Sequence, residues 1–206
     1  MIEKISWQKV DSQILIVQSL QAGNILLATS DTVLGLLSDT TQQSVALLNE
    51  IKGREKKPYI ILIESSIKAL HFIDENALKK YQKLVNACWP GPLTLIFKAK
   101  KDLPAYLQGA DGTVALRVPK HEGLLAVLKP FKGLFSTSAN KAGQPVPTAI
   151  EDIDPDILAK IPYVVLDSGD LYSKSVLPST ILDLTGEKAT VVRQGAYPID
   201  EINNFL

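Results

Sequence analysis

Cysteine and histidine are scarce in this sequence: Cys88 stands alone, and His71 and His121 are the two imidazoles. A single cysteine cannot form an intrachain disulfide or a cysteine-based zinc site. A catalytic thiol would need one of the two imidazoles as its base. Because Cys88 falls in an apolar helical pattern, we expect it to be a buried structural residue.

An excess of charge of either sign is also lacking, since Lys+Arg and Asp+Glu each number 22. Aromatic residues make up 6% of the chain. Phosphate neutralisation and base stacking both need residues that this composition does not concentrate, which argues against a dedicated RNA-binding module. Any anion site must therefore be local.

Long apolar runs are missing as well. No run approaches the roughly 20 residues that span a bilayer, and residues 1–7 contain no apolar signal region. We therefore expect a cytoplasmic protein without a membrane partner. The GxxxxGK[ST], GxGxxG, HExxH and GxSxG motifs are absent too, so a nucleotide site would need another cradle.

Apolar periodicity predicts strands interspersed with helices. We expect helices at residues 12–22, 41–51, 74–88 (capped by Asp74), 121–128, 155–160 and 199–205, and strands at 24–29, 33–37, 58–63, 93–97, 114–118, 131–135, 163–166, 180–184 and 189–192. Some connections are too short for a helix, so the sheet should be mixed, with parallel and antiparallel pairs. The predicted fold class is a single α/β domain over residues 1–206.

Residues 134–145 change from apolar to polar within a few positions. Ser136, Thr137, Ser138 and Asn140 follow what reads as a short buried strand. Hydroxyls and amides are uncharged and can donate and accept, so they suit phosphate or carboxylate oxygens. An ordinary polar loop that caps the next helix would have the same composition.

Residues 52–57 place four cations beside an expected helix C-terminus. In an extended exit from that helix, Lys52 and Arg54 would point the same way and could hold triphosphate oxygens. A solvated basic turn, favoured by the helix dipole, accounts equally for these residues.

Two further arginines and one polar corner are candidates. Arg117 lies inside an apolar run, so its charge must be paired or line a cleft. Arg193 follows a strand, from which it can reach over a sheet edge. Residues 29–32 form a polar corner that is either an Asx turn or a contact to an amino-acid ligand.

Seven short segments follow one another along the chain: Asp31–Leu36, Lys52–Arg54, Trp89–Thr94, Arg117–Pro119, Ser136–Asn140, Ser179–Ile181 and Arg193–Gly195. In this order they resemble the YrdC-like family, and within it the short, single-domain threonylcarbamoyl-AMP synthases of the TsaC/YrdC type. The resemblance covers residues 24–196 and implies a twisted mixed sheet with flanking helices and a concave basic cleft. The chain departs from the family pattern at Thr29-Ser30, where Pro-Thr is common, and at Leu34, where an aromatic is common.

The resemblance implies that L-threonine, bicarbonate and ATP give L-threonylcarbamoyladenylate and pyrophosphate. A downstream threonylcarbamoyl-transfer complex would use the product to modify tRNA, and weak tRNA binding by this chain is compatible with that role. Mg²⁺ is expected to arrive with ATP, without metal ligands from the protein.

The same resemblance assigns the site residues. The catalytic residues are those of the K-x-R motif, Lys52 and Arg54. The ATP-binding residues are Lys52, Ser138, Asn140, Arg193 and Arg117, and the threonine-binding residues are Thr32, Arg54, Ser136 and Ser179. Two alternatives stay open: a YciO-like paralogue with another substrate, and an RNA-binding or ribosome-assembly module.

Overall fold

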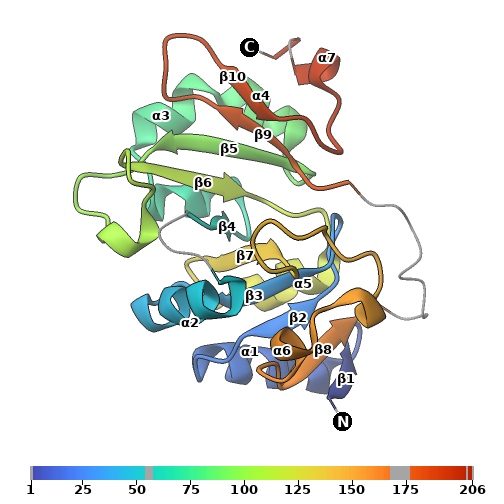
Figure 1. The fold of residues 1–206 in the computed structure, drawn as a ribbon. Coiled ribbons are helices and arrows are strands. Elements are labelled where there is room, and N and C mark those ends of the chain that lie inside the picture. Colours follow the sequence, from blue (N-terminus) through green and yellow to red (C-terminus); the bar gives the residue numbers. More distant parts are fainter. Residues whose placement is uncertain (1, 54–57, 168–176, 203, 206) are drawn as a thin grey trace.

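A computed structural model of the chain describes residues 2–53, 58–167, 177–202 and 204–205. Over these residues the strands form one sheet, which Figure 1 shows from β10 at the top to β1 at the bottom. In sheet order the strands are β1 (Glu3–Ser6), β8 (Tyr163–Leu166), β2 (Leu26–Ala28), β3 (Gly35–Asp39), β7 (Leu134–Ser138), β4 (Ile60–Leu62), β6 (Thr113–Arg117), β5 (Leu93–Lys98), β9 (Thr180–Asp183) and β10 (Thr190–Arg193).

The sheet is mixed, as predicted. The pairs β1–β8, β2–β8, β4–β6 and β5–β9 are parallel, and the pairs β2–β3, β3–β7, β4–β7, β5–β6 and β9–β10 are antiparallel. The strands expected at 180–184 and 189–192 are confirmed as the antiparallel pair β9–β10.

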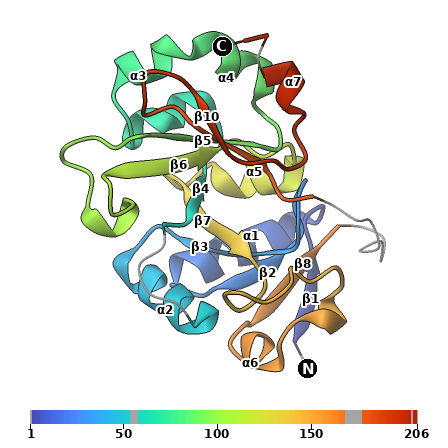
Figure 2. The ribbon, with the colours of Figure 1, turned by 45° about the horizontal axis from the view of Figure 1, so that its top comes forward.

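Helices cover both faces of the sheet. They are α1 (Val10–Gln21), α2 (Gln42–Lys52), α3 (Glu75–Lys80), α4 (Gln82–Cys88), α5 (Glu122–Leu128), α6 (Pro155–Leu158) and α7 (Ile199–Ile202), with 3₁₀ turns at Ser66–His71, Ala105–Leu107 and Ile150–Asp152. In Figure 2, α1 and α5 lie behind the central strands, on the side away from α2.

Alternation along the strands explains why there are two cores. Successive strand side chains point to opposite faces. Leu26 and Leu62 therefore pack with α1 and α5, whereas their neighbours Leu27 and Ile61 pack on the other face, where α2 and α4 contribute. All four are buried, which is typical of strands covered on both sides.

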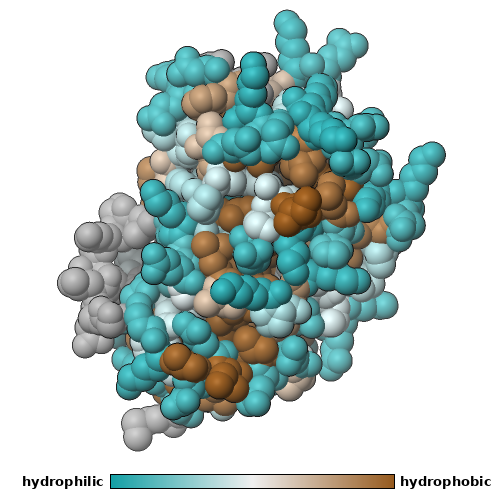
Figure 3. Space-filling model, turned by 180° about the vertical axis from the view of Figure 1, so that it is seen from behind, coloured by the Kyte–Doolittle hydropathy of each residue, from teal (hydrophilic) through white to brown (hydrophobic). Residues whose placement is uncertain are grey.

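Helix α1 is confirmed, but its buried face differs from the apolar stripe in its sequence. Ile16 and Leu20, one turn apart, are buried against the sheet, whereas Ile14 is 52% exposed. Ile14 lies one turn after exposed Val10, on the solvent side of the helix. Figure 3 shows the back of the molecule, where apolar side chains form separate groups within a hydrophilic surface. The helical spacing of apolar residues in 12–22 predicted the helix correctly but not which of its faces is buried.

Three other elements differ from the expectations. The helix expected at 74–88 breaks at Tyr81 into α3 and α4, and the Asp74 side chain makes no capping hydrogen bond. Strand β1 was not predicted, because Glu3–Ser6 is polar and partly exposed; parallel pairing with β8 stabilises it. Strand β7 continues to Ser138 instead of ending before Ser136, because β3 pairs with it along its whole length.

The single cysteine is buried at the end of α4, as expected. Burial raises the pKa of the Cys88 thiol. None of the described helices has both the length and the apolar character needed to cross a membrane.

Phe135 is 1% exposed and lies at the centre of the sheet, where its ring packs on that of Tyr59. We expect Phe135→Ala to lower the free energy of unfolding by about 3–5 kcal/mol, because it removes a buried ring and leaves a cavity. Urea denaturation measures this change. Phe205→Ala, at a residue that is 37% exposed, is the control. Equal losses in the two variants would contradict the assignment of Phe135 to the core.

Candidate active site

The predicted site residues that the structure describes line one cleft of about 340 Å³, within the usual range for small-molecule sites. They are Thr32, Lys52, Arg117, Ser136, Ser138, Asn140, Ser179 and Arg193. They come from six segments spread over most of the chain. Arg54 lies outside the described residues.

Lys52 is the last residue of α2 and is 3% exposed. Gly53 follows with φ +58°, a left-handed conformation that glycine adopts readily, and ends the helix one residue beyond the expected range of 41–51. The Lys52 ammonium donates to the Ser138 carbonyl oxygen at 2.7 Å and to Asn140 Oδ1 at 3.1 Å. Lys52 therefore enters the cleft from a helix terminus. The predicted extended exit is wrong for this residue, because the helix continues through it.

Ser136 and Ser138 belong to β7, so the prediction that they follow the strand is wrong. Because strand side chains alternate, the two hydroxyls project from the same face of the sheet. Ser138 Oγ donates to Asn140 Oδ1, and Asn140 Nδ2 donates to the carbonyl oxygen of Gln144. The polar groups are thus fixed by a paired strand and by hydrogen bonds, a more precise arrangement than an open loop.

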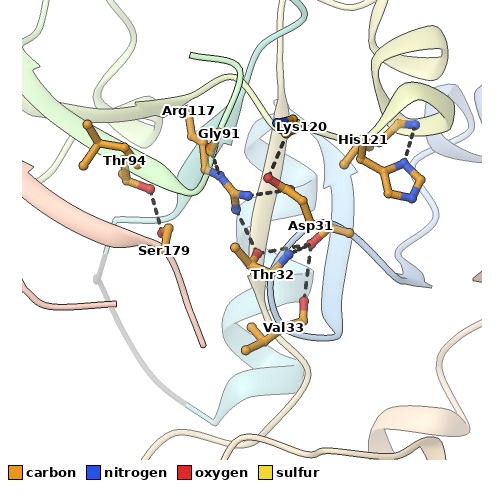
Figure 4. Close-up of polar contacts among 12 residues, drawn as sticks. Asp31, Thr32, Val33, Gly91, Thr94, Arg117, Lys120, His121 and Ser179 are labelled. Carbon is orange, nitrogen blue, oxygen red and sulfur yellow. Dashed lines mark hydrogen bonds and ion pairs between the residues drawn. The ribbon is translucent and has the colours of Figure 1, made fainter. Parts of the chain in front are cut away.

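Arg117 is 4% exposed and both expectations for it hold: it is paired, and it lines the cleft. Its Nε donates to the Gly91 carbonyl at 3.0 Å, one Nη donates to Thr32 Oγ1 at 2.9 Å, and the other is ion-paired with Asp31. Figure 4 shows these contacts. Burial lowers the pKa of Arg117, and the nearby Asp31 carboxylate opposes that shift.

Arg193 is the final residue of β10, and its side chain reaches back to the segment before β9. Its Nε and Nη donate to the carbonyl oxygen of Ser179 at 3.0 and 2.9 Å. The Ser179 hydroxyl lies 2.8 Å from that of Thr94, a buried residue of β5 (Figure 4). The pKa of Arg193 is lowered first by burial and then by the positive charge of Arg117.

The polar corner at residues 29–32 is both a turn and a cleft wall. Ser30 Oγ accepts from the Thr32 backbone N–H at 3.2 Å, which is the local turn expected of such a sequence. The Thr32 hydroxyl accepts from Arg117 at the edge of the cleft. The corner can therefore form the local turn and contact a ligand at the same time.

The two departures from the family pattern lie outside the cleft lining. Leu34 is fully buried in the core. Thr29 Oγ1 accepts from the Trp7 indole N–H at 2.9 Å and donates to Asp167 Oδ2 at 3.2 Å.

Three cations and several hydroxyls thus share one cleft. Among the described residues that line it there is no carboxylate. Lys52, Arg117 and Arg193 supply positive charge, and the Ser136 hydroxyl and the Asn140 amide add neutral donors, a combination that suits phosphate and carboxylate oxygens. Nowhere in the described ranges do three His, Cys, Asp or Glu side chains gather as a metal site would require.

Sequence analysis assigned no role to Asp31 or Thr94, although both lie in recognised segments. The signal for Asp31 was the buried position of Arg117, because a guanidinium inside an apolar run needs a counter-charge. No comparable signal existed for Thr94, whose partner Ser179 is 85 residues away.

Fold and cleft together define an α/β protein with a cationic, hydroxyl-lined ligand site on a mixed sheet. The profile of the Sua5/YciO/YrdC family, described as "Telomere recombination", matches residues 18–195. The chain belongs to this family.

Named relatives are similar over most of this chain. A putative threonylcarbamoyl-AMP synthase from Methanocaldococcus jannaschii is 31% identical over 189 residues, covering 87% of this chain and 84% of the relative. A threonylcarbamoyl-AMP synthase from Klebsiella pneumoniae is 31% identical over 177 residues, covering 84% and 90%. The synthase from Pyrococcus abyssi is 28% identical over 91% of this chain, which spans only 55% of that relative's length.

Solved structures have the same fold. P. abyssi Sua5 complexed with L-threonine superposes with a TM-score of 0.85 at 27% identity, covering 100% of this chain and 61% of Sua5. Escherichia coli YciO superposes with a TM-score of 0.80 at 20% identity, covering 100% and 99%, and supports the fold alone.

We expect Lys52→Met to weaken the binding of inorganic triphosphate by about tenfold or more, because a buried charge that faces the cleft is lost. Titration calorimetry measures the affinity, and thermal denaturation verifies the fold. Lys79→Met, at an exposed residue of α3, is the matched control. Unchanged triphosphate affinity in Lys52→Met would show that the cleft does not bind polyphosphate through this lysine.

Proposed function

We propose that this protein is an L-threonylcarbamoyladenylate synthase that uses L-threonine, bicarbonate and ATP. The observation that carries the proposal is the convergence of Lys52, Arg193, Ser138 and Asn140 on one cleft, in a chain of this family. The names of the relatives support the same activity.

ATP would bind through Lys52, Arg117 and Arg193, with Ser138 and Asn140 fixing the phosphates. Guanidinium groups form paired hydrogen bonds to phosphate oxygens, and an ammonium adds a compact charge. The Ser138–Asn140 hydrogen bond and the contacts of Asn140 with Lys52 and Gln144 hold these groups before any ligand arrives. Less conformational freedom is then lost on binding.

Threonine would bind beside the phosphates, at Thr32, Ser136 and Ser179, together with Arg54 of the K-x-R motif. The complex of P. abyssi Sua5 with L-threonine supports a threonine site in this fold. Thr32 is hydrogen-bonded to the buried Arg117 and Ser179 to Arg193, so an amino-acid carboxylate has cationic partners there.

The chemistry requires two anions to approach each other. The neutral threonine amine captures CO2 derived from bicarbonate and loses a proton, which gives a carbamate. A carbamate oxygen then attacks the α-phosphorus of ATP, and the bond to the β-phosphate oxygen breaks to release pyrophosphate. Lys52, Arg54 and Arg193 would offset the repulsion and stabilise the charge on the leaving group. No covalent intermediate with the protein is needed.

Mg²⁺ would accompany ATP. The described cleft lining offers hydroxyl and carbonyl oxygens but no carboxylate, so the triphosphate itself would supply the anionic ligands. The metal would neutralise phosphate charge during the displacement.

The product is an activated acyl-adenylate, which a downstream threonylcarbamoyl-transfer complex would consume to modify tRNA. A cytoplasmic location, where ATP and tRNA are available, fits this role. Weak contact of the chain with tRNA is compatible with it.

Release of pyrophosphate from ATP tests the activity. We expect release to require both L-threonine and bicarbonate, and a mass spectrum to contain threonylcarbamoyladenylate. Release that needs neither co-substrate would favour a paralogue with another substrate, and salt-dependent RNA binding without ATP turnover would favour an RNA-binding module.

We expect Lys52→Ala and Arg54→Ala to reduce adenylate formation to background, because each removes a charge from the K-x-R motif. Circular dichroism should be unchanged. Lys79→Ala, on the exposed side of α3, should retain full activity. Wild-type turnover in the two motif variants would contradict their assignment.

Chelation of divalent cations by EDTA should abolish pyrophosphate release, and excess Mg²⁺ should restore it, because the metal neutralises the triphosphate. Undiminished release in EDTA would contradict the proposed role of Mg²⁺.

A further inference from the structure

Asp31 is a partly buried acidic residue with no part in the roles proposed above. It lies at the corner between β2 and β3, directly before Thr32, and its side chain is 12% exposed. Its Oδ1 pairs with Arg117, and its Oδ2 accepts from the Lys120 backbone N–H at 2.9 Å. Figure 4 shows that one carboxylate joins three separate segments: the corner, β6 and the turn before α5.

The neighbouring contacts fix the Arg117 guanidinium from several directions. Thr32 accepts from one Nη, Asp31 from the other, and Gly91 accepts from Nε. A guanidinium has five N–H groups. Counted over the described residues, three have acceptors, which leaves two for a ligand in the cleft that Arg117 lines.

Asp31 also affects the electrostatic repulsion between Arg117 and Arg193. Arg117 and Arg193 lie close enough for one positive charge to lower the pKa of the other. Asp31 contacts Arg117 but does not belong to the cleft lining. It therefore offsets the repulsion between the two arginines without placing a negative charge where an anionic substrate would bind.

We propose that Asp31 is a positioning residue, which holds the Arg117 guanidinium so that its free N–H groups bind a substrate oxyanion. The oxyanion is the carboxylate of threonine or a phosphate of ATP. The identity of these substrates rests on the proposed function, whereas the orientation of Arg117 rests on the contacts of Asp31.

The test compares Asp31→Asn, Arg117→Gln and the double variant. Asparagine keeps the shape of Asp31 and an oxygen for the Lys120 N–H, but removes the charge. We expect Asp31→Asn to raise the KM for threonine or for ATP by about tenfold, the effect of losing one charge-assisted hydrogen bond. The substrate whose KM rises identifies the oxyanion, and kcat should change less than that KM.

A residue that acts through Arg117 should have no further effect once Arg117 is replaced. The double variant should therefore have the KM of Arg117→Gln alone. Unchanged KM values in Asp31→Asn, or a double variant whose effect is the product of the two single effects, would overturn the proposal. Asp74→Asn, which removes an exposed carboxylate that caps no helix, should match the wild type.

A readout without turnover separates this proposal from the proposed function. In ¹⁵N NMR spectra, a fixed Arg117 should give separate Nη–H signals in the wild type and averaged signals in Asp31→Asn. A mobile guanidinium in both proteins would overturn the role of Asp31 even in an active enzyme. Absence of threonine-dependent pyrophosphate release by the wild type would instead count against the proposed function alone.

Thermal denaturation of every variant tests for loss of the fold. If Asp31→Asn does not fold, Asp31→Glu replaces it, because glutamate keeps the charge but moves the carboxylate by one methylene. We then expect a higher substrate KM with a retained ion pair, and a wild-type KM would overturn the requirement for this geometry.

Discussion

Repulsion among the cations of the cleft is the constraint on which the arrangement of its other polar groups depends. Lys52 and Arg117 are buried and Arg193 is exposed, and all three line the cleft of about 340 Å³, in which the positive charge of Arg117 lowers the pKa of Arg193. Main-chain carbonyl groups accept hydrogen bonds from two of these cations, at Ser138 from the lysine and at Ser179 from Arg193, and the Asp31 carboxylate pairs with Arg117. Carbonyl dipoles stabilise a cation without cancelling its charge, so the cleft keeps a positive potential.

The sheet brings these groups together. Strand β7 pairs with β3 on one side and β4 on the other, and β4 pairs in turn with β6, which carries Arg117. Lys52 reaches the end of β7 from a helix that follows β3 along the chain. The central strands therefore position Ser136, Ser138 and Arg117 through their pairing.

Local sequence signals predicted the positions of the helices and strands better than they predicted the contacts between them. The helix expected at 41–51 is observed as Gln42–Lys52, because the capping Thr41 and the terminating Gly53 act within a few residues of its ends. The continuation of β7 through Ser138 was missed, because only pairing with a distant strand gives three polar residues a strand conformation. The contact of Lys52 with Ser138 spans 86 residues, and apolar periodicity cannot identify such partners. The resemblance to a family instead indicated which distant residues form the site together.

Lys52 makes two hydrogen bonds to the segment 138–142. Its ammonium donates to the Ser138 carbonyl, and its own carbonyl accepts from the Ala142 N–H at 2.9 Å. Ordering a free lysine side chain costs about 1.5–2 kcal/mol of conformational entropy. Here that loss occurs when the chain folds. The ammonium is therefore already in place when an anion arrives, and the anion binds without first having to order this side chain.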